Sequence, residues 1–283
     1  MFSYFDLEQK IDFYARAGAN VGIVGKAESG LPIYFVKLGD GDQKIIVTAS
    51  IHARESITAS LCLNQIEYAL AVKPTAQIYF IPCLNPDGAI LFSHGDGYFG
   101  QNRALNVQKI NGGSKNYSLW KANVNGVDLN TNFPARWGTG KENRFSPSSE
   151  SFVGFSPLDQ SESRAIAEFT DKIKPDGTLS YHAKGQIAYW FFHQEKYLRR
   201  DRKIAQAVAE KLGYVLGESF TTSAGGYKDY CVQKYEIPSL TLEIIPDSFT
   251  HPLPDYALDS SEINKHLDLP QFFAEMIKKY SNL

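Results

Sequence analysis

The chain has 283 residues, of which 43% are hydrophobic and 13% aromatic, and its formal net charge at pH 7 is −2. This composition is sufficient for a large hydrophobic core, so we expect a single α/β domain over residues 1–283. The near-neutral charge does not favour general binding to nucleic acid or to anionic membranes.

The amino terminus and the cysteines bear on localisation. The first 18 residues contain early acidic side chains and no unbroken apolar run, so they do not resemble a secretory signal. No window approaches the roughly 20 apolar residues that a membrane span needs. The three cysteines lack C-x-x-C spacing and are expected as reduced thiols. We therefore expect a cytoplasmic protein with no nucleic-acid, membrane or obligate protein partner.

The first part of the chain combines helical and extended patterns. Apolar spacing predicts amphipathic helices over residues 5–17 and 55–72. Strand-like runs at 33–38 and 44–50 are joined by Gly-Asp-Gly-Asp, which predicts a β-hairpin. A further strand is predicted at 77–82.

Residues 85–157 are rich in Gly, Asn, Ser and Pro and have little periodicity, so they are predicted as a long loop region of the kind that often carries function. Regular patterns then resume. The remaining predicted helices cover 158–172, 195–212 and 262–280, and the remaining strands cover 178–182, 186–192 and 238–245. This order indicates a mixed, mostly parallel twisted sheet covered by helices on both faces.

Side chains that can bind a metal lie at the ends of three predicted strands. His52 and Glu55 follow the second strand, His182 ends the fourth, and Glu243 ends the apolar part of the last. In open α/β sheets, ligands bind at the carboxyl ends of the strands. We therefore expect these four side chains to meet at one edge of the sheet.

This set of residues suits a catalytic zinc ion, which often takes two histidines and a glutamate and keeps one position open. We expect His52, Glu55 and His182 to hold one Zn²⁺ ion and Glu243 to accept a proton from water. Each feature alone has a simpler explanation, because a His-x-x-Glu pair arises by chance in about one chain in three of ordinary composition. Their coincidence at one sheet edge favours the metal site.

Several segments, in the same order, resemble the zinc carboxypeptidases, the carboxypeptidase A-like family. "IHARESIT" at 51–58 resembles the first zinc-binding segment, and "NPDG" at 85–88 resembles a family turn. "LWKANVNGVDLNTNF" at 119–133 resembles the segment that holds an oxyanion-stabilising residue and a substrate-carboxylate clamp. "SYHAKG" falls where the last zinc ligand is expected. "SAGGYKDY" followed by "PSLTLEI" resembles the specificity loop and the strand of the catalytic glutamate.

The resemblance implies roles for individual residues. Glu243 would be the general base, and Lys121, directly after a tryptophan, would stabilise the oxyanion. Arg103 is a second candidate for the oxyanion, because its loop is expected to border the cleft. Arg54 and Asn130 would contact the substrate.

The sequence also departs from the family. Thr131 occupies the place of the arginine that grips the substrate's terminal carboxylate, and threonine cannot form a bidentate ion pair. The family's mobile tyrosine is absent, since its place falls near Thr221. Arg136 or Arg144 could supply a displaced clamp. Lys228, at the position that sets side-chain preference, would favour an acidic group.

These features predict a zinc-dependent peptidase that hydrolyses an amide bond in a small peptide with an acidic end. The γ-D-glutamyl-diaminopimelate bond of cell-wall peptides is one such substrate, and some relatives of the family cleave it. Conventional release of C-terminal residues, deacylation of small N-acyl amino acids and a silent peptide-binding module remain alternatives. Glu243 favours an enzyme, because a binding module needs no carboxylate beside the metal.

Overall fold

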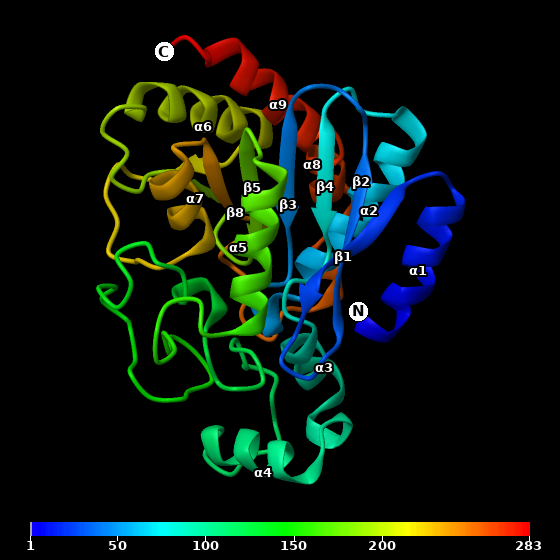
Figure 1. Cartoon of the computed structure of the whole chain (residues 1–283), viewed down its shortest axis with the longest axis vertical. Helices are drawn as coiled ribbons and strands as arrows, with labels where there is room; N and C mark the ends of the chain where they lie inside the picture. Colours follow the sequence, from blue (N-terminus) through cyan, green and yellow to red (C-terminus); the bar gives the residue numbers. More distant parts are fainter. Residues whose placement is uncertain (1) are drawn as a thin grey trace.

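Figure 1 shows the computed structural model of the chain, which describes residues 2–283. Within these residues eight strands form one sheet, in the order β1-β2-β4-β3-β5-β8-β6-β7. The strands are β1 (Asn20–Lys26), β2 (Pro32–Leu38), β3 (Lys44–Thr48), β4 (Gln77–Ile81), β5 (Gly177–His182), β6 (Ile187–Tyr189), β7 (Val215–Leu216) and β8 (Ser239–Glu243). The helices are α1 (Tyr4–Arg16), α2 (Ile57–Val72), α3 (Pro86–His94), α4 (Gln101–Ile110), α5 (Ser161–Ile173), α6 (Leu198–Leu212), α7 (Tyr227–Tyr235), α8 (Ser260–His266) and α9 (Leu269–Tyr280).

The centre of the sheet is parallel and is covered by helices on both faces. Strands β4, β3, β5 and β8 pair in parallel, whereas β1 with β2, β2 with β4, and β6 with β8 pair antiparallel. One buried apolar cluster joins the sheet to α1, α2, α6 and α9, and another joins it to α5 and α7. Along β3, Ile45 and Val47 enter the first cluster and Ile46 enters the second, as the alternation of strand side chains requires. The predicted fold class is confirmed.

The hairpin predicted between residues 33–38 and 44–50 is wrong. β2 pairs with β1 and β4, and β4 lies between β2 and β3. The glycines of the connecting turn serve a close backbone approach instead, since a Cβ on Gly39 would lie 1.9 Å from the carbonyl oxygen of Ala76. A close backbone approach and a hairpin turn both favour glycine, so the sequence pattern does not distinguish between these two structures.

Residues 85–157 contain more regular structure than predicted, because α3 and α4 lie within them. Together with the irregular segments of the same region, these helices gather beyond one end of the sheet (Figure 1). The predicted helix at 262–280 is interrupted, and α9 restarts with Pro270 in its first turn. Neither β1, β7 nor α7 is among the elements predicted from the sequence.

A buried polar cluster fixes the end of β8. The Tyr214 hydroxyl lies 3.2 Å from the carbonyl oxygen of Ile244, which directly follows β8, and 2.9 Å from His266 Nε2. The same hydroxyl contacts the carboxylate of Glu262. Burial opposes ionisation of this carboxylate, but hydrogen bonds from His266, Lys265 and Tyr214 outweigh it and lower the pKa of Glu262 to about 2.

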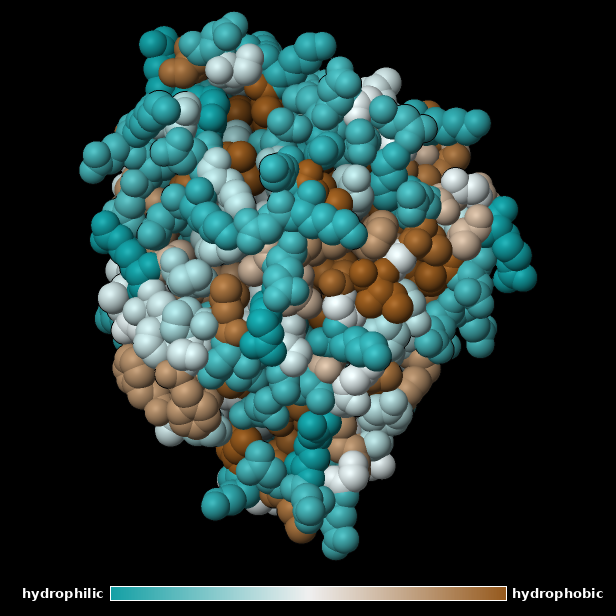
Figure 2. Space-filling view, in the orientation of Figure 1, coloured by the Kyte–Doolittle hydropathy of each residue, from teal (hydrophilic) through white to brown (hydrophobic). Residues whose placement is uncertain are grey.

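The surface is mostly hydrophilic on the face shown in Figure 2, with apolar side chains in separate patches. Among residues 2–283 no helix combines the length and the apolar composition needed to cross a membrane. The cytoplasmic location expected from the sequence stays a prediction.

Replacement Glu262→Gln is expected to destabilise the protein in a pH-dependent way. In the folded protein the pKa of Glu262 is lowered from its ordinary range to about 2, so the ionised carboxylate stabilises the fold at neutral pH. This contribution is lost as the pH falls from about 5 towards 2. Urea unfolding at pH 7 and pH 3 measures it, with the exposed Glu275→Gln as control. An equal destabilisation at both pH values would contradict the ionised cluster.

Candidate metal centre and active-site cavity

Three neighbouring strand ends bring the predicted site residues together. β3, β5 and β8 are adjacent and parallel, and His182 pairs with Glu243 in the register between β5 and β8. Beyond β3 the chain turns at Ser50, which has a left-handed φ of 51°. The Thr58 hydroxyl fixes this turn, because it accepts the Ser50 N–H and donates to the carbonyl of Glu55. The turn carries the following residues back over the end of β5.

The side chains of His52, Glu55 and His182 form a compact buried group, and their potential ligand atoms all lie within 4.8 Å of one another. His52 Nδ1 lies 3.0 Å from Glu55 Oε1 and 3.1 Å from His182 Nδ1. His182 Nδ1 lies 3.3 Å from Glu55 Oε2. Burial opposes ionisation of Glu55, but the two histidines outweigh it and hold the pKa of Glu55 well below its usual value.

This geometry fits one metal ion. Tetrahedral zinc with bonds of about 2.0–2.1 Å to nitrogen or oxygen requires ligand atoms about 3.3 Å apart, close to the separations seen here. At these distances the two imidazole Nδ1 atoms and the Glu55 carboxylate face one another with more lone pairs than hydrogen-bond donors. A cation between them would bind these lone pairs. The group is therefore suitable for binding one metal ion.

A buried aspartate orients one of these ligands. Asp128 Oδ1 lies 3.2 Å from His52 Nε2, and Asp128 Oδ2 lies 3.0 Å from Lys121 Nζ. The backbone N–H groups of Asn130 and Ser151 also donate to this carboxylate. Burial opposes ionisation, but Lys121 and His52 outweigh it and hold the pKa of Asp128 well below its usual value. An ionised Asp128 favours the His52 tautomer with the proton on Nε2, which leaves Nδ1 free as a ligand.

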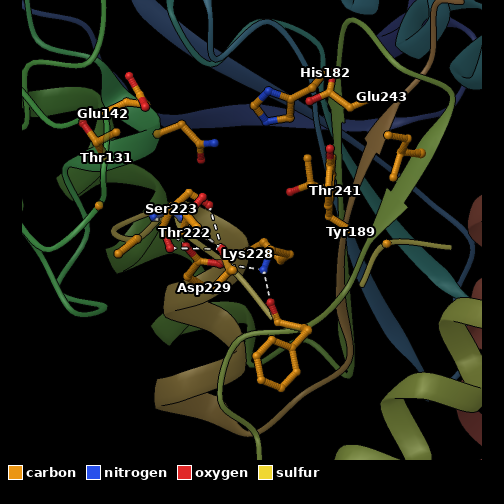
Figure 3. A pocket seen from close by; sticks show the side chains of 18 of the residues that line it. Thr131, Glu142, His182, Tyr189, Thr222, Ser223, Lys228, Asp229, Thr241 and Glu243 are labelled. Atoms are coloured by element: carbon orange, nitrogen blue, oxygen red, sulfur yellow. Dashed lines mark hydrogen bonds and ion pairs between the residues drawn. The ribbon is translucent and has the colours of Figure 1, made fainter. Parts of the chain in front are cut away.

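Glu243 lies beside the metal group at the top of the cavity in Figure 3. Glu243 Oε2 and His182 Nε2 are both buried, and neither atom has a hydrogen-bond partner among the described residues. Burial raises the pKa of Glu243 to about 8, and nearby Glu55 acts in the same direction. The carboxyl group can therefore exchange a proton near neutral pH.

The metal group opens into a cavity of about 640 Å³. Figure 3 shows Thr131 and Glu142 on one side, Tyr189 and Thr241 on the other, and Lys228 at the end away from His182. The space is large enough for a short peptide segment and is concave, as binding sites for small ligands usually are.

Lys228 lines the cavity as predicted, but its charge is compensated. Its Nζ atom lies 2.5 Å from Asp229 Oδ1 and donates to the carbonyl of Phe191 at 2.9 Å. Both charged side chains are buried and both line the cavity. The preference of this position for an acidic group stays a prediction, and such a group would meet Asp229 as well as Lys228.

Asn130 also lines the cavity, as do Thr131 and Thr221. Thr131 stands in the place of the family's arginine, and Thr221 falls near the place of its mobile tyrosine. Asn130 Oδ1 accepts the backbone N–H of Tyr227, so it ties the cavity to the start of α7. The Thr131 hydroxyl donates to the backbone carbonyl of Asp128 at 2.8 Å and is thus engaged within its own turn.

The predicted arginines do not line the cavity. Arg54 donates to the carbonyl of Leu119 and pairs with Glu150. Arg103 lies on α4 and donates to the carbonyl of Glu28, so it does not border the site as expected. The two candidates for a displaced clamp are elsewhere too: Arg144 contacts Ser148 and Glu150, and Arg136 is exposed.

The sequence reasoning did not single out Asp128, Glu142 or Asp229. Asp128 stands two residues before Asn130, and this spacing within "VDLN" is the only local signal for it. Asp229 directly follows Lys228, so opposite charges next to each other could have indicated the pair. No sequence pattern indicates that Glu142 lines the cavity.

Comparisons with known proteins agree with this geometry. Residues 18–265 match the family described as Zinc carboxypeptidase. Over 258 residues the chain is 32% identical to "Gamma-D-glutamyl-L-diamino acid endopeptidase 1" of Lysinibacillus sphaericus, a match that covers 84% of this chain and 63% of that protein. It is 29% identical to "Uncharacterized protein YqgT" of Bacillus subtilis (strain 168), over 78% of this chain and 63% of the relative. The chain thus spans less than two thirds of the length of these relatives.

Solved structures share the fold. Bovine thrombin-activatable fibrinolysis inhibitor, solved with a tick carboxypeptidase inhibitor, superposes with a TM-score of 0.79 at 18% identity, over 98% of this chain and 97% of that chain. Murein-tripeptide amidase MpaA from Escherichia coli O157 gives a TM-score of 0.61 at 20% identity, over 91% of this chain and 95% of that chain. Because the family match extends over residues 18–265 and so includes the metal group and the cavity, this chain belongs to the zinc carboxypeptidase family.

Proposed function

We propose that this protein is a zinc-dependent peptidase, a single domain over residues 1–283, that hydrolyses the bond between γ-D-glutamate and an L-diamino acid in a small peptide. The observation that carries the chemistry is the position of Glu243, beside His182 in the sheet register and next to a buried His-Glu-His group. The relative from Lysinibacillus sphaericus, named for action on a γ-D-glutamyl-L-diamino acid bond, suggests the substrate class.

In this proposal His52, Glu55 and His182 hold one zinc ion, which supplies Lewis-acid polarisation to the scissile carbonyl and to water. Asp128 keeps His52 in the ligand tautomer. Glu243 accepts the proton of the attacking water and passes it to the leaving amine, because its carboxylate lies beside the metal group and its Oε2 atom has no hydrogen-bond partner among the described residues.

Lys121 is placed to stabilise the negative charge that develops on the substrate oxygen. Its side chain lines the cavity and is 22% exposed, and its ammonium pairs with Asp128. Burial opposes its charge, but Asp128 and Glu55 outweigh it and raise the pKa of Lys121. The lysine therefore stays protonated throughout the neutral pH range, as an oxyanion donor must.

The cavity favours a bond other than that of a conventional C-terminal residue. A carboxypeptidase needs a cation for the free terminal carboxylate, and Thr131 stands where the family has arginine. The cations among the described lining residues are Lys121 and Lys228, and each is paired with an aspartate. The described lining therefore offers a terminal carboxylate no lysine without an acidic partner, which argues against the conventional activity.

Replacement His182→Ala is expected to remove zinc from the purified protein. The wild type should hold about one ion per chain after dialysis, and the variant far less, because three protein ligands are needed for tight binding. Mass spectrometry of the metal measures this, with the exposed His94→Ala as control. Full zinc content in His182→Ala would exclude this ligand set.

The proposed activity is tested with zinc-loaded protein and a peptide panel. L-Ala-γ-D-Glu-meso-diaminopimelate is expected to release diaminopimelate, and ordinary α-linked peptides are expected to remain intact. Glu243→Gln should retain zinc but lose about 10²–10⁴-fold in kcat, since it removes the general base and no metal ligand. Mass spectrometry identifies the products. Release of C-terminal residues from ordinary peptides would instead indicate a conventional carboxypeptidase.

A further inference from the structure

Three basic side chains lie next to the metal ligands but outside the cavity. Arg54 directly precedes Glu55 in the chain, Lys184 follows His182 by two residues, and His251 lies in the segment after β8. None of these three basic residues lines the cavity. They therefore border the metal group on a side other than the one that opens towards the cavity.

Hydrogen bonds of Ala183 bring these segments together. Its backbone N–H donates to Glu55 Oε2 at 3.2 Å, and its carbonyl oxygen lies 3.3 Å from His251 Nε2. The pKa of His251 is lowered, first by burial, and the charges of Arg54 and Lys184 act in the same direction. Because charges act strongly only over short distances in water, both cations must lie near this histidine. Arg54 and Lys184 thus form one positively charged region beside the metal group.

The guanidinium of Arg54 is not saturated by its protein partners. Its Nη1 atom donates to the carbonyl of Leu119 at 3.1 Å and to Glu150 at 3.4 Å. Its Nε atom is buried and has no hydrogen-bond partner among the described residues. The Glu150 carboxylate is partly exposed and also pairs with Arg144 at 3.5 Å, so its charge is shared between two arginines. A guanidinium has five N–H donors, so capacity for an anion remains.

Lys184 is paired only with an exposed acid. Its Nζ atom donates to the backbone carbonyl of Asp247 at 2.9 Å and contacts the carboxylate of the same residue. This carboxylate is 81% exposed, so water screens its attraction for the ammonium. An ammonium has three N–H donors, which leaves one for a ligand. The two lysines of the cavity differ in this respect, because Lys121 and Lys228 pair with buried aspartates.

A γ-glutamyl substrate has a free carboxylate on the acyl side of its reactive bond. The carbonyl that reacts belongs to the glutamate side chain, and two methylene groups separate it from the carbon that bears the α-carboxylate. An ordinary α-linked peptide has no backbone carboxylate at this place. In the proposed function the cavity takes the part of the peptide after the reactive bond, so the acyl part extends from the metal group outside the cavity, where Arg54 and Lys184 lie.

We propose that Arg54 and Lys184 bind the free α-carboxylate of the glutamyl residue and so recognise the γ-linkage of the substrate. Both cations form charge-assisted hydrogen bonds with the carboxylate, which are stronger than bonds between neutral groups. This anion site acts on the acyl part of the substrate and is separate from the cavity. The inference rests on the proposed function and deepens it, because it names the group by which a γ-linked glutamate is distinguished.

Two peptides that differ in a single group test this site. L-Ala-γ-D-Glu-L-Lys has the α-carboxylate, and L-Ala-D-isoglutaminyl-L-Lys has a neutral carboxamide in its place. Calorimetric titration of zinc-loaded Glu243→Gln protein measures binding while both peptides stay intact. The acid is expected to bind about tenfold more tightly than the carboxamide. This ratio should fall as salt is added, since both cations are partly exposed.

Substitutions in the same background assign the effect to each cation. Arg54→Gln should weaken binding of the acid about tenfold and leave binding of the carboxamide unchanged. Arg54→Lys, which keeps the charge but not the planar fork, should retain part of the preference. Lys184→Gln should weaken binding of the acid by a smaller factor, because one N–H of its ammonium is available. The matched control is Arg199→Gln, an exposed arginine on α6, which should leave both dissociation constants unchanged.

The two peptides also distinguish recognition from damage to the fold. Equal weakening of both peptides by Arg54→Gln would assign it a structural role and overturn the anion site. Zinc content and thermal unfolding show which variants are folded, and Arg54→Lys and Lys184→Gln carry the test where Arg54→Gln is not.

The outcomes separate this inference from the proposed activity. A preference for the acid that depends on Arg54 and Lys184 supports the anion site, even where the wild type cleaves neither peptide, and the proposed activity alone then fails. Cleavage of the γ-D-glutamyl peptide with equal binding of acid and carboxamide supports the activity and overturns the anion site. Binding of neither peptide would overturn both.

Discussion

The parallel pairing of β3, β5 and β8 is the constraint on which the site depends. Parallel neighbours must end at the same edge of the sheet, so the segments that follow β3 and those that end β5 and β8 meet there. The register between β5 and β8 sets His182 directly beside Glu243. Tyr214 holds the chain after β8 through the Ile244 carbonyl, which supports that register at the carboxyl end of the strand.

The second level of organisation is the docking of the irregular segments on this edge. The N–H groups of Ala53 and Arg54 donate to the carbonyls of Lys121 and Trp120, and the Asn85 side chain donates to the carbonyls of Ile51 and Ala122. These bonds bring the lysine segment against the turn that carries the metal group. They also explain why the "NPDG" segment accompanies the metal-binding one, since its asparagine joins the two.

Charge compensation governs the interior of the cavity. Asp128 is buried and is balanced by Lys121 and His52, and Asp229 is buried and is balanced by Lys228. A buried charge without a partner costs several kcal/mol, so each acidic group requires its neighbour. As a result, both lysines among the described residues that line the cavity, Lys121 and Lys228, have an acidic partner. Selectivity in such a site follows from the arrangement of opposite charges rather than from a single attractive one.

The sequence by itself determined the fold class and the metal group. His52, Glu55, His182 and Glu243 could be placed together because strand patterns locate strand ends, and a parallel sheet brings those ends to one edge. This inference needs only local periodicity and a general rule of α/β architecture.

The tertiary structure alone decided which charges are free. Arg103 is turned towards Glu28, Arg54 towards Glu150, and Lys228 is joined to Asp229 and the Phe191 carbonyl. Most of these partners lie far away along the chain, so the sequence does not indicate that they are in contact. The hairpin error has the same origin, because the insertion of β4 between β2 and β3 is a long-range choice that a local turn signal cannot report.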